Sequence, residues 1–152
     1  MDDHAAEARR LFLSGANCAQ AVLGAFHREC GLELETALKL SSGFGGGVAR
    51  LREVCGAVSG MVMAAGLLRG YADFGDKAAK DAHYALIQRL AAEFRTANGS
   101  IVCRELLGLP EKTADAPVSE ARTEHYYRKR PCVELVAQAA AILERELAAT
   151  AK

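Results

Sequence analysis

Apolar and polar residues alternate along the chain mainly with the period of a helix, because runs rich in Ala and Leu recur between short stretches of Gly, Ser and Asn. Val, Ile and Thr are few, and no segment sustains the two-residue alternation that is typical of a strand. The pattern predicts an all-α fold, a compact bundle of about six or seven helices. The helical spacing is clearest at Ala79, Ala82, Leu86, Leu90 and Phe94, and again at Val136, Ala140, Leu143 and Leu147.

Capping residues and glycines indicate where these helices begin and end. Asn17 is a good N-cap for the second helix, and Gly31 is a good stop. A glycine cluster at 43–47 is expected to be a loop, and so is the polar stretch 111–118. The expected helices cover residues 3–13, 17–30, 33–40, 52–68, 76–98, 101–107 and 119–130, with a last helix from 131.

The composition is that of a globular protein that forms one domain over residues 1–152. Hydrophobic residues make up 51% and charged residues 25%, which excludes a disordered or low-complexity chain. Lys plus Arg equals Asp plus Glu at 19 each, so the formal net charge is zero. No broad field exists to attract nucleic acid or anionic lipid, and no nucleic-acid partner is expected.

Membrane insertion is not expected either. The longest run without a charged residue is Val54 to Leu68, which is shorter than the roughly 18 to 20 residues of a membrane span. We interpret it as a buried core helix. The N-terminus is acidic and leads into an amphipathic stretch, so it lacks the features of a secretory signal, and a cytoplasmic location is expected.

Four of the five cysteines coincide with predicted helix starts. Cys18 follows an Asn cap, Cys103 lies three residues after the expected cap Ser100, and Cys132 follows a proline. Cys55 lies two or three residues after the expected start of the core helix. A helix N-terminus carries partial positive charge, which favours a thiolate over a thiol, and the thiolate is the form that ligates metal or attacks disulfides. We therefore predict that these four cysteines form one redox or metal site.

Cys30 differs from the other four, because it is expected at a helix C-terminus, where the helix dipole disfavours a thiolate. We exclude it from the site. No C-x-x-C pair is present, so a common site for the four would have to be assembled by the packing of distant helices. The alternative is that the cysteines are small, inert, buried hydrophobes, as free cysteines commonly are.

Several motifs together resemble one known family. They are Asn17-Cys18-Ala19-Gln20, the glycine cluster, Cys55-Gly56-Ala57-Val58-Ser59-Gly60, Cys103-Arg104-Glu105 and Cys132. In this order they are similar to the C-GCAxxG-C-C family, which is described as redox-active. The resemblance covers most of the chain from about residue 16 and implies a small helical protein with four characteristic cysteines, matching Cys18, Cys55, Cys103 and Cys132.

The resemblance also implies candidate cofactors. The family is similar to a domain of split-Soret cytochromes, in which such cysteines are thought to hold an iron–sulfur cluster beside separately bound haems. This chain has no C-x-x-C-H motif for haem attachment, so haem is not expected. Electron transfer or redox sensing, with a redox partner protein, is the first hypothesis, through a [2Fe–2S] type cluster or a thiol/disulfide pair. A closed zinc site in a non-redox binding module and a structural protein with inert cysteines are the alternatives.

Glycines near the cysteines are candidates to support a cofactor. Gly45, Gly46 and Gly47 lead towards Cys55 and could offer backbone N–H groups to the site. The cluster lacks the ending of a phosphate-binding P-loop, so a nucleotide is not expected. Gly56 and Gly60 form a small-residue groove on the core helix, which a second helix, in the same chain or in a homodimer, or a cofactor could approach closely.

Overall fold

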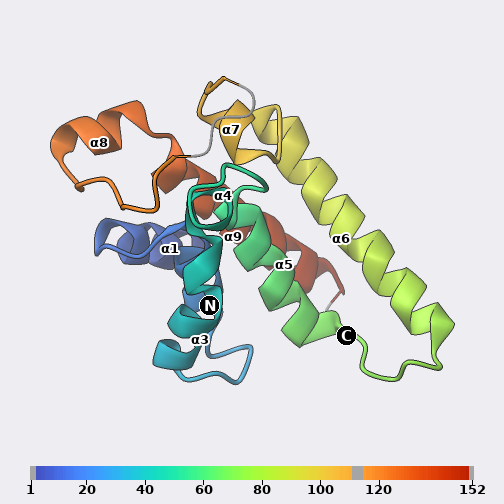
Figure 1. Cartoon of the computed structure of the whole chain (residues 1–152). Coiled ribbons are helices and arrows are strands. Elements are labelled where there is room, and N and C mark those ends of the chain that lie inside the picture. The colour runs from blue at the N-terminus through green and yellow to red at the C-terminus, as the bar shows by residue number, and fades with distance from the viewer. Residues whose placement is uncertain (1–2, 111–114, 151–152) are drawn as a thin grey trace.

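The computed structural model describes residues 3–110 and 115–150, and within them it is all-helical, as predicted (Figure 1). Among these residues there is no strand, only one isolated antiparallel bridge between Val54 and Val102. The elements are α1 (His4–Leu13), α2 (Cys18–Ala25), α3 (Leu34–Ser41), the 3-10 turn η1 (Ser42–Phe44), α4 (Gly45–Val48), α5 (Gly56–Arg69), α6 (Lys77–Asn98), α7 (Cys103–Leu106), α8 (Glu124–Lys129) and α9 (Cys132–Thr150).

Helices α1, α2, α5 and α9 surround the hydrophobic core. α1 packs against α2 and α9, and α2 also packs against α5. The long α6 lies along one side of this group, and α8 lies at the opposite end of the molecule (Figure 1). The largest fully buried side chains come from these central helices and α6, and they include Phe12, Leu23, Met61, Phe94 and Leu143.

Local capping signals determine the first two helix starts as predicted. The Asp3 side chain accepts a hydrogen bond from the backbone N–H of Ala6 at the start of α1. At the start of α2, Asn17 and Gln20 form a reciprocal capping box, in which each side chain accepts from the backbone N–H of the other residue.

Two predicted boundaries near the core are wrong. The second helix ends at Ala25 and is followed by turns up to Gly31, rather than continuing to Cys30. The core helix begins at Gly56 instead of Arg52 or Glu53, because the preceding residues pair with the segment around Val102. Long-range pairing of this kind leaves no local signal in the sequence.

The glycine cluster is more ordered than the predicted loop. η1 and α4 follow α3 directly, and the residues from Gly46 to Arg50 all have positive φ, between 49° and 70°. Arg52 also has a positive φ, of 63°. This left-handed turn, residues 46–52, costs free energy at each residue with a side chain, so it persists only where the surrounding structure enforces it.

The C-terminal third departs from prediction in three places. The N-cap of α7 is Val102 and not Ser100, whose hydroxyl instead accepts from the Val102 N–H. The helix expected over 119–130 is shorter, because α8 begins after Thr123. Of the loop expected at 111–118, residues 111–114 lie outside the described residues. The last helix starts one residue after Pro131.

The small-residue groove on α5 is filled from within the chain. A methyl group on Gly60 would lie 2.7 Å from the carbonyl oxygen of Ala19, and one on Gly56 would lie 3.1 Å from the Cys18 Cβ. α2 therefore approaches α5 at backbone distance, as the close-packing interpretation predicts. The homodimer stays a prediction, but this groove is occupied by α2 and is not free to contact a second copy of the chain.

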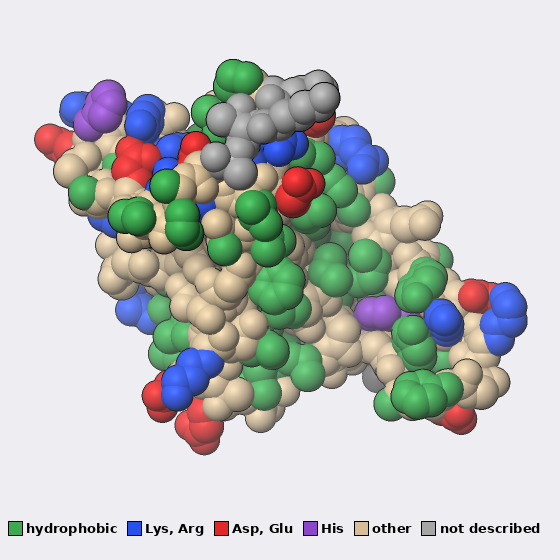
Figure 2. All heavy atoms as spheres, in the orientation of Figure 1, with side chains coloured by type: hydrophobic (Ala, Val, Ile, Leu, Met, Phe, Trp, Pro, Cys, Tyr) green, Lys and Arg blue, Asp and Glu red, His purple; other side chains and the backbone are tan. Residues whose placement is uncertain are grey.

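Charged and apolar side chains occupy different parts of the face seen in Figure 2. Charges of both signs gather around α8, whereas apolar side chains spread over the centre of the face. Leu51, Val54 and Leu67 are among the large apolar residues that remain exposed. Among the described residues, no helix is both long and apolar enough to cross a membrane.

A buried histidine at the start of α1 forms hydrogen bonds with two other parts of the chain. His4 lies between two carboxylates, with Nδ1 2.7 Å from Glu144 of α9 and Nε2 2.8 Å from Glu29. Its ring stacks on Phe26 with the centroids 4.0 Å apart. Burial by itself lowers the pKa of His4, but hydrogen bonds and charge from Glu144 and Glu29 outweigh burial and raise the pKa above 6.5.

The change His4→Gln is expected to lower the free energy of unfolding by about 1–3 kcal/mol at pH 6, because it removes two charge-assisted hydrogen bonds. A raised pKa in the folded state means that this contribution is complete below the unfolded pKa of about 6.5 and disappears as the pH rises through the folded value. Urea unfolding of both proteins at pH 6 and pH 9 measures it. The exposed His125, changed to Gln, is the control, and an equal loss at both pH values would contradict the role of the charged ring.

Candidate functional site

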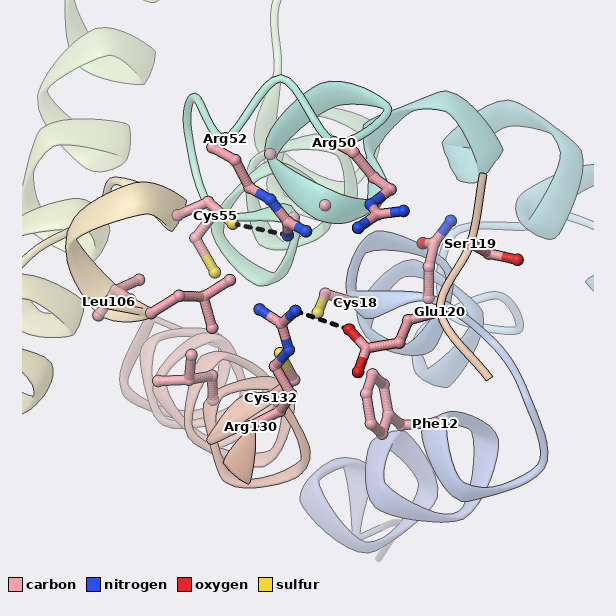
Figure 3. Close-up of a pocket in the computed structure, with 18 of the residues that line it drawn as sticks. Phe12, Cys18, Arg50, Arg52, Cys55, Leu106, Ser119, Glu120, Arg130 and Cys132 are labelled. Atoms are coloured by element: carbon pink, nitrogen blue, oxygen red, sulfur yellow. Dashed lines mark hydrogen bonds and ion pairs between the residues drawn. The ribbon is translucent and has the colours of Figure 1, made fainter. Parts of the chain in front are cut away.

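The four cysteines predicted to converge line a single cavity of about 190 Å³, which we call the cysteine cavity (Figure 3). All four are buried, with exposed fractions between 4% and 9%. Each stands at a helix start: Cys18, Cys103 and Cys132 are the first residues of α2, α7 and α9, and Cys55 is the N-cap of α5. The structure thus brings together residues that are up to 114 positions apart.

Backbone pairing makes neighbours of Cys55 and Cys103. The Cys55 N–H donates to the carbonyl oxygen of Ile101 at 2.8 Å, and the Cys103 N–H donates to that of Glu53 at 2.6 Å. These two bonds flank the bridge between Val54 and Val102. The start of α7 is therefore held against the start of α5, with one cysteine from each at the cavity wall.

Cys18 and Cys132 form the second pair, across the contact between α2 and α9. Their side chains share a hydrogen bond, and they carry opposite pKa shifts. That hydrogen bond lowers the pKa of Cys132, with help from the positive charges of Arg130 and Arg122. The same hydrogen bond, followed by burial, raises the pKa of Cys18. Cys132 is thus the more acidic thiol of the pair, and Cys18 is the donor in the shared hydrogen bond.

The expectation that a helix start favours the thiolate holds for only one of the four. Burial raises the pKa of Cys55 to about 12, although the backbone N–H groups of Ala57 and Val58 act in the opposite direction. Burial also raises the pKa of Cys103, against the opposing hydrogen bond from Arg52. Both cysteines lie at helix starts, although the sequence placed those starts at Arg52 or Glu53 and at Ile101. Desolvation of a charged sulfur outweighs the helix dipole at these two residues.

Cys30 is placed away from the cysteine cavity, as predicted. It is half-buried after the end of α2, and its thiol lies 3.8 Å from the carbonyl oxygen of Ala64. Burial, followed by the charge of Glu29, raises the pKa of Cys30 to about 11. The sulfur is a weak nucleophile at neutral pH and provides a natural control for the other four.

Four of the five candidate glycines line the cysteine cavity: Gly45, Gly46, Gly47 and Gly56. Gly60 is not among the lining residues and serves the contact with α2 instead. Gly47 has a φ of 67°, and a methyl group there would lie 2.7 Å from the Cβ of Cys103. The backbone of the left-handed turn therefore forms one wall of the cavity, in direct contact with a cysteine.

Arginines in the cavity wall were missed by the sequence analysis. Arg50, Arg52, Arg122 and Arg130 all line it, against one lining carboxylate, Glu120. Arg130 belongs to a basic triplet that would ordinarily be solvated, yet only 12% of its side chain is exposed. Nothing in the spacing of these arginines indicates convergence, because they lie on segments that meet only in the folded chain.

The segment 115–123 lies beside the cavity and is bound through these arginines. Asp115 pairs with Arg50 and Arg52, and Glu120 pairs with Arg130 at 2.8 Å. Arg122 contacts α1. Its guanidinium donates to the carbonyl oxygen of Phe12 at 2.9 Å and lies 4.3 Å from the centre of the Phe12 ring. Salt bridges and backbone contacts thus attach this segment to α1 and to the left-handed turn.

No disulfide joins the described cysteines, and all five are free. Among the described residues, no three His, Cys, Asp or Glu side chains are gathered closely enough to hold a single metal ion. The cysteine cavity presents four thiols: Cys18 and Cys132 share a hydrogen bond, and Cys55 and Cys103 stand on segments that pair through the backbone. Among its described lining residues, arginines outnumber carboxylates.

Comparison with known proteins gives one match. A family model described as "Putative redox-active protein (C_GCAxxG_C_C)" matches residues 16–146, which is most of the chain and contains all four cysteines of the cavity. The comparisons with curated proteins and with solved structures gave no match.

The change Gly47→Ala is expected to destabilise the fold and disturb the cavity wall. A left-handed alanine costs about 1–2 kcal/mol from the backbone alone, and the contact with Cys103 adds to this. Gly43→Ala is the matched control in the same cluster, because a methyl group there has no neighbour within 4 Å. Urea unfolding midpoints compare the two variants, and equal midpoints would show that the left-handed turn is not under strain.

Proposed function

We propose that this chain, which belongs to the C_GCAxxG_C_C family, is a redox protein whose electron-carrying centre is formed by Cys18, Cys55, Cys103 and Cys132. The observation that carries the proposal is the convergence of four buried thiols from four helix starts on one cavity. Packing alone does not require sulfur at four helix starts. A shared redox centre does, because it needs several sulfurs within reach of one another.

In the first form of the centre, the four cysteines hold an iron–sulfur cluster of the [2Fe–2S] type. Such a cluster takes two thiolates on each iron. Cys18 and Cys132 share a hydrogen bond, and the segments that carry Cys55 and Cys103 pair through the backbone, so each contact would supply two ligands. The cluster would supply one-electron exchange. The pairs come from separate contacts, α2 with α9 and α5 with α7, so each contact would position one half of the ligand set.

Electrostatics of the cavity wall also fit an anionic group. Four thiolates in a buried space need compensating charge, because burial raises the pKa values of Cys55 and Cys103, and the hydrogen bond with Cys132, followed by burial, raises that of Cys18. The lining arginines supply positive charge, and the first backbone N–H groups of α5 reach the Cys55 sulfur. These groups would tune a cluster through charge and hydrogen bonds to its sulfurs.

In the second form, the centre cycles between dithiol and disulfide at Cys18 and Cys132, whose hydrogen bond favours this form. The Cys132 thiolate attacks the disulfide of an oxidised partner protein, and one partner sulfur leaves as a thiolate. Cys18 then loses its proton and attacks the Cys132 sulfur, which releases the second partner thiolate. The protein ends with a Cys18–Cys132 disulfide, and two electrons have passed to the partner.

A zinc site and inert cysteines remain the alternatives. Zinc in a structural site takes four sulfurs around one ion, which requires the two pairs of cysteines to draw together around one point. Stoichiometric zinc and unfolding by a chelator would identify that module. Inert cysteines would show themselves by slow modification of every thiol in the folded protein.

Protein purified without oxygen is expected to contain about two iron and two sulfide per chain if the first form is correct. Changing Cys18, Cys55, Cys103 or Cys132 to Ser should each abolish the iron content and the visible absorption, whereas Cys30→Ser should keep both. Metal analysis, a sulfide assay and a free-thiol count on the same samples separate the cluster from the dithiol. Protein without iron whose free-thiol count stays the same after oxidation would refute both forms.

Alkylation by iodoacetamide tests the order of reactivity in metal-free, reduced protein. Because the pKa of Cys132 lies below 9.0 and those of the other four lie above it, Cys132 should be modified first, with a rate that reaches half its maximum below pH 9. Peptide mass analysis after timed quenching identifies the modified residue. Faster modification of Cys18, or a loss of the fast phase in Cys30→Ser, would contradict this assignment.

A further inference from the structure

The buried side chain of Arg52 touches one of the four cysteines directly. Only 6% of it is exposed, and its guanidinium donates through Nη1 to the sulfur of Cys103 at 3.7 Å. Figure 3 shows the guanidinium directed into the cysteine cavity. Burying a charged group costs free energy unless the group is paired with an opposite charge and hydrogen-bonded.

The backbone around Arg52 is shaped to place it there. Arg52 has a left-handed φ of 63°, an uncommon conformation for a residue with a long side chain. Its N–H donates to the carbonyl oxygen of Gly46 at 3.2 Å, and the next N–H, of Glu53, donates to that of Gly47 at 2.8 Å. Strained positions of this kind cluster at functional sites, where the surrounding structure enforces them.

A carboxylate on a distant segment holds the other side of the guanidinium. Asp115 accepts from Nε of Arg52 at 2.9 Å and also from Nη2. Arg52, followed by Arg50, lowers the pKa of Asp115, so this carboxylate stays ionised at neutral pH. Arg52 is therefore fixed in two directions, with its donor Nη1 left for Cys103.

We propose that Arg52, held by Asp115, is a positioning residue that sets the reduction potential of the four-cysteine centre through its contact with Cys103. The inference rests on the proposed function and applies to both of its forms. In the cluster form, reduction adds one electron and therefore one negative charge next to Arg52. In the dithiol form, reduction of the Cys18–Cys132 disulfide takes two electrons and restores two thiols. The charge of Arg52 reaches Cys132 as well as Cys103, and it favours the thiolate state of Cys132.

The sign of the effect is the same in both cases. A positive charge close to the centre stabilises the state with more negative charge, which is the reduced state, and so raises the potential. The other charged groups around Cys103 are Arg130, which acts in the same direction, and Cys132, which acts in the opposite one. Arg52 is distinguished from the remaining lining arginines by its direct contact with a cysteine sulfur.

The test is a redox titration of the purified protein, with dithionite for a cluster or a dithiothreitol buffer for a dithiol. Arg52→Gln is expected to lower the equilibrium constant for reduction about tenfold. The potential should therefore become more negative, by about 59 mV for a one-electron centre or about 30 mV for a two-electron centre. Arg52→Lys, which keeps the positive charge, should have a reduction potential close to that of the wild type. Asp115→Asn removes the carboxylate that holds the guanidinium against Cys103, so it should shift the potential in the same direction as Arg52→Gln, by a smaller amount.

Arg50→Gln is the matched control, because Arg50 belongs to the same turn and pairs with the same carboxylate. Its shift should be clearly smaller than that of Arg52→Gln. An unchanged potential in Arg52→Gln, or an equal shift in Arg50→Gln, would overturn the inference and leave the proposed function standing. If Arg52→Gln does not fold, Asp115→Asn decides, since an unchanged potential or a shift towards positive potential there overturns it. A wild-type protein with no reducible centre would overturn the proposed function itself.

Discussion

The site depends on one short piece of backbone pairing, between the residues that precede α5 and the residues that precede α7. Three residues on each side, 53–55 and 101–103, form the bridge between Val54 and Val102 and the two hydrogen bonds that flank it, and without this pairing Cys103 would lose its place beside Cys55. α7 has only four residues, and so short a helix has no stability of its own in water. The bridge and the left-handed turn therefore maintain α7, and with it the position of Cys103, against the body of the protein.

Local signals predicted the parts of the structure that depend on neighbours in sequence. Asn17 caps α2 and Cys18 follows it, because a capping box needs only four adjacent residues. Helical spacing correctly predicted the buried residues Leu86, Leu90 and Phe94 of α6 and Val136, Ala140 and Leu143 of α9, whereas Ala79, Ala82 and Leu147 are not buried. The left-handed φ of Arg52 and the inward position of Arg130 could not be predicted, because they depend on contacts between residues that are not neighbours in sequence, Arg52 with Asp115 and Arg130 with Glu120.

The surroundings of each thiol explain why similar positions in the fold do not produce similar chemistry. Cys18 and Cys132 each open a helix, but their shared hydrogen bond raises the pKa of Cys18 and lowers that of Cys132. Burial raises both pKa values, and the charges of Arg130 and Arg122 lower that of Cys132. The difference between the two thiols arises from their surroundings in the folded chain and not from their helix dipoles, so a sequence comparison of helix starts cannot reveal it.

The order of the cysteines along the chain has a consequence for biosynthesis. Cys132 lies 114 positions after Cys18, and it opens the last helix. At ribosomal rates of about 5–20 residues per second, Cys18 waits roughly 6–23 s before its partner has been polymerised. During that interval the nascent chain carries unpaired thiols from the first half of the site. The redox conditions where the chain is synthesised, and the time at which α9 docks, therefore decide whether those sulfurs reach their neighbours in the folded site.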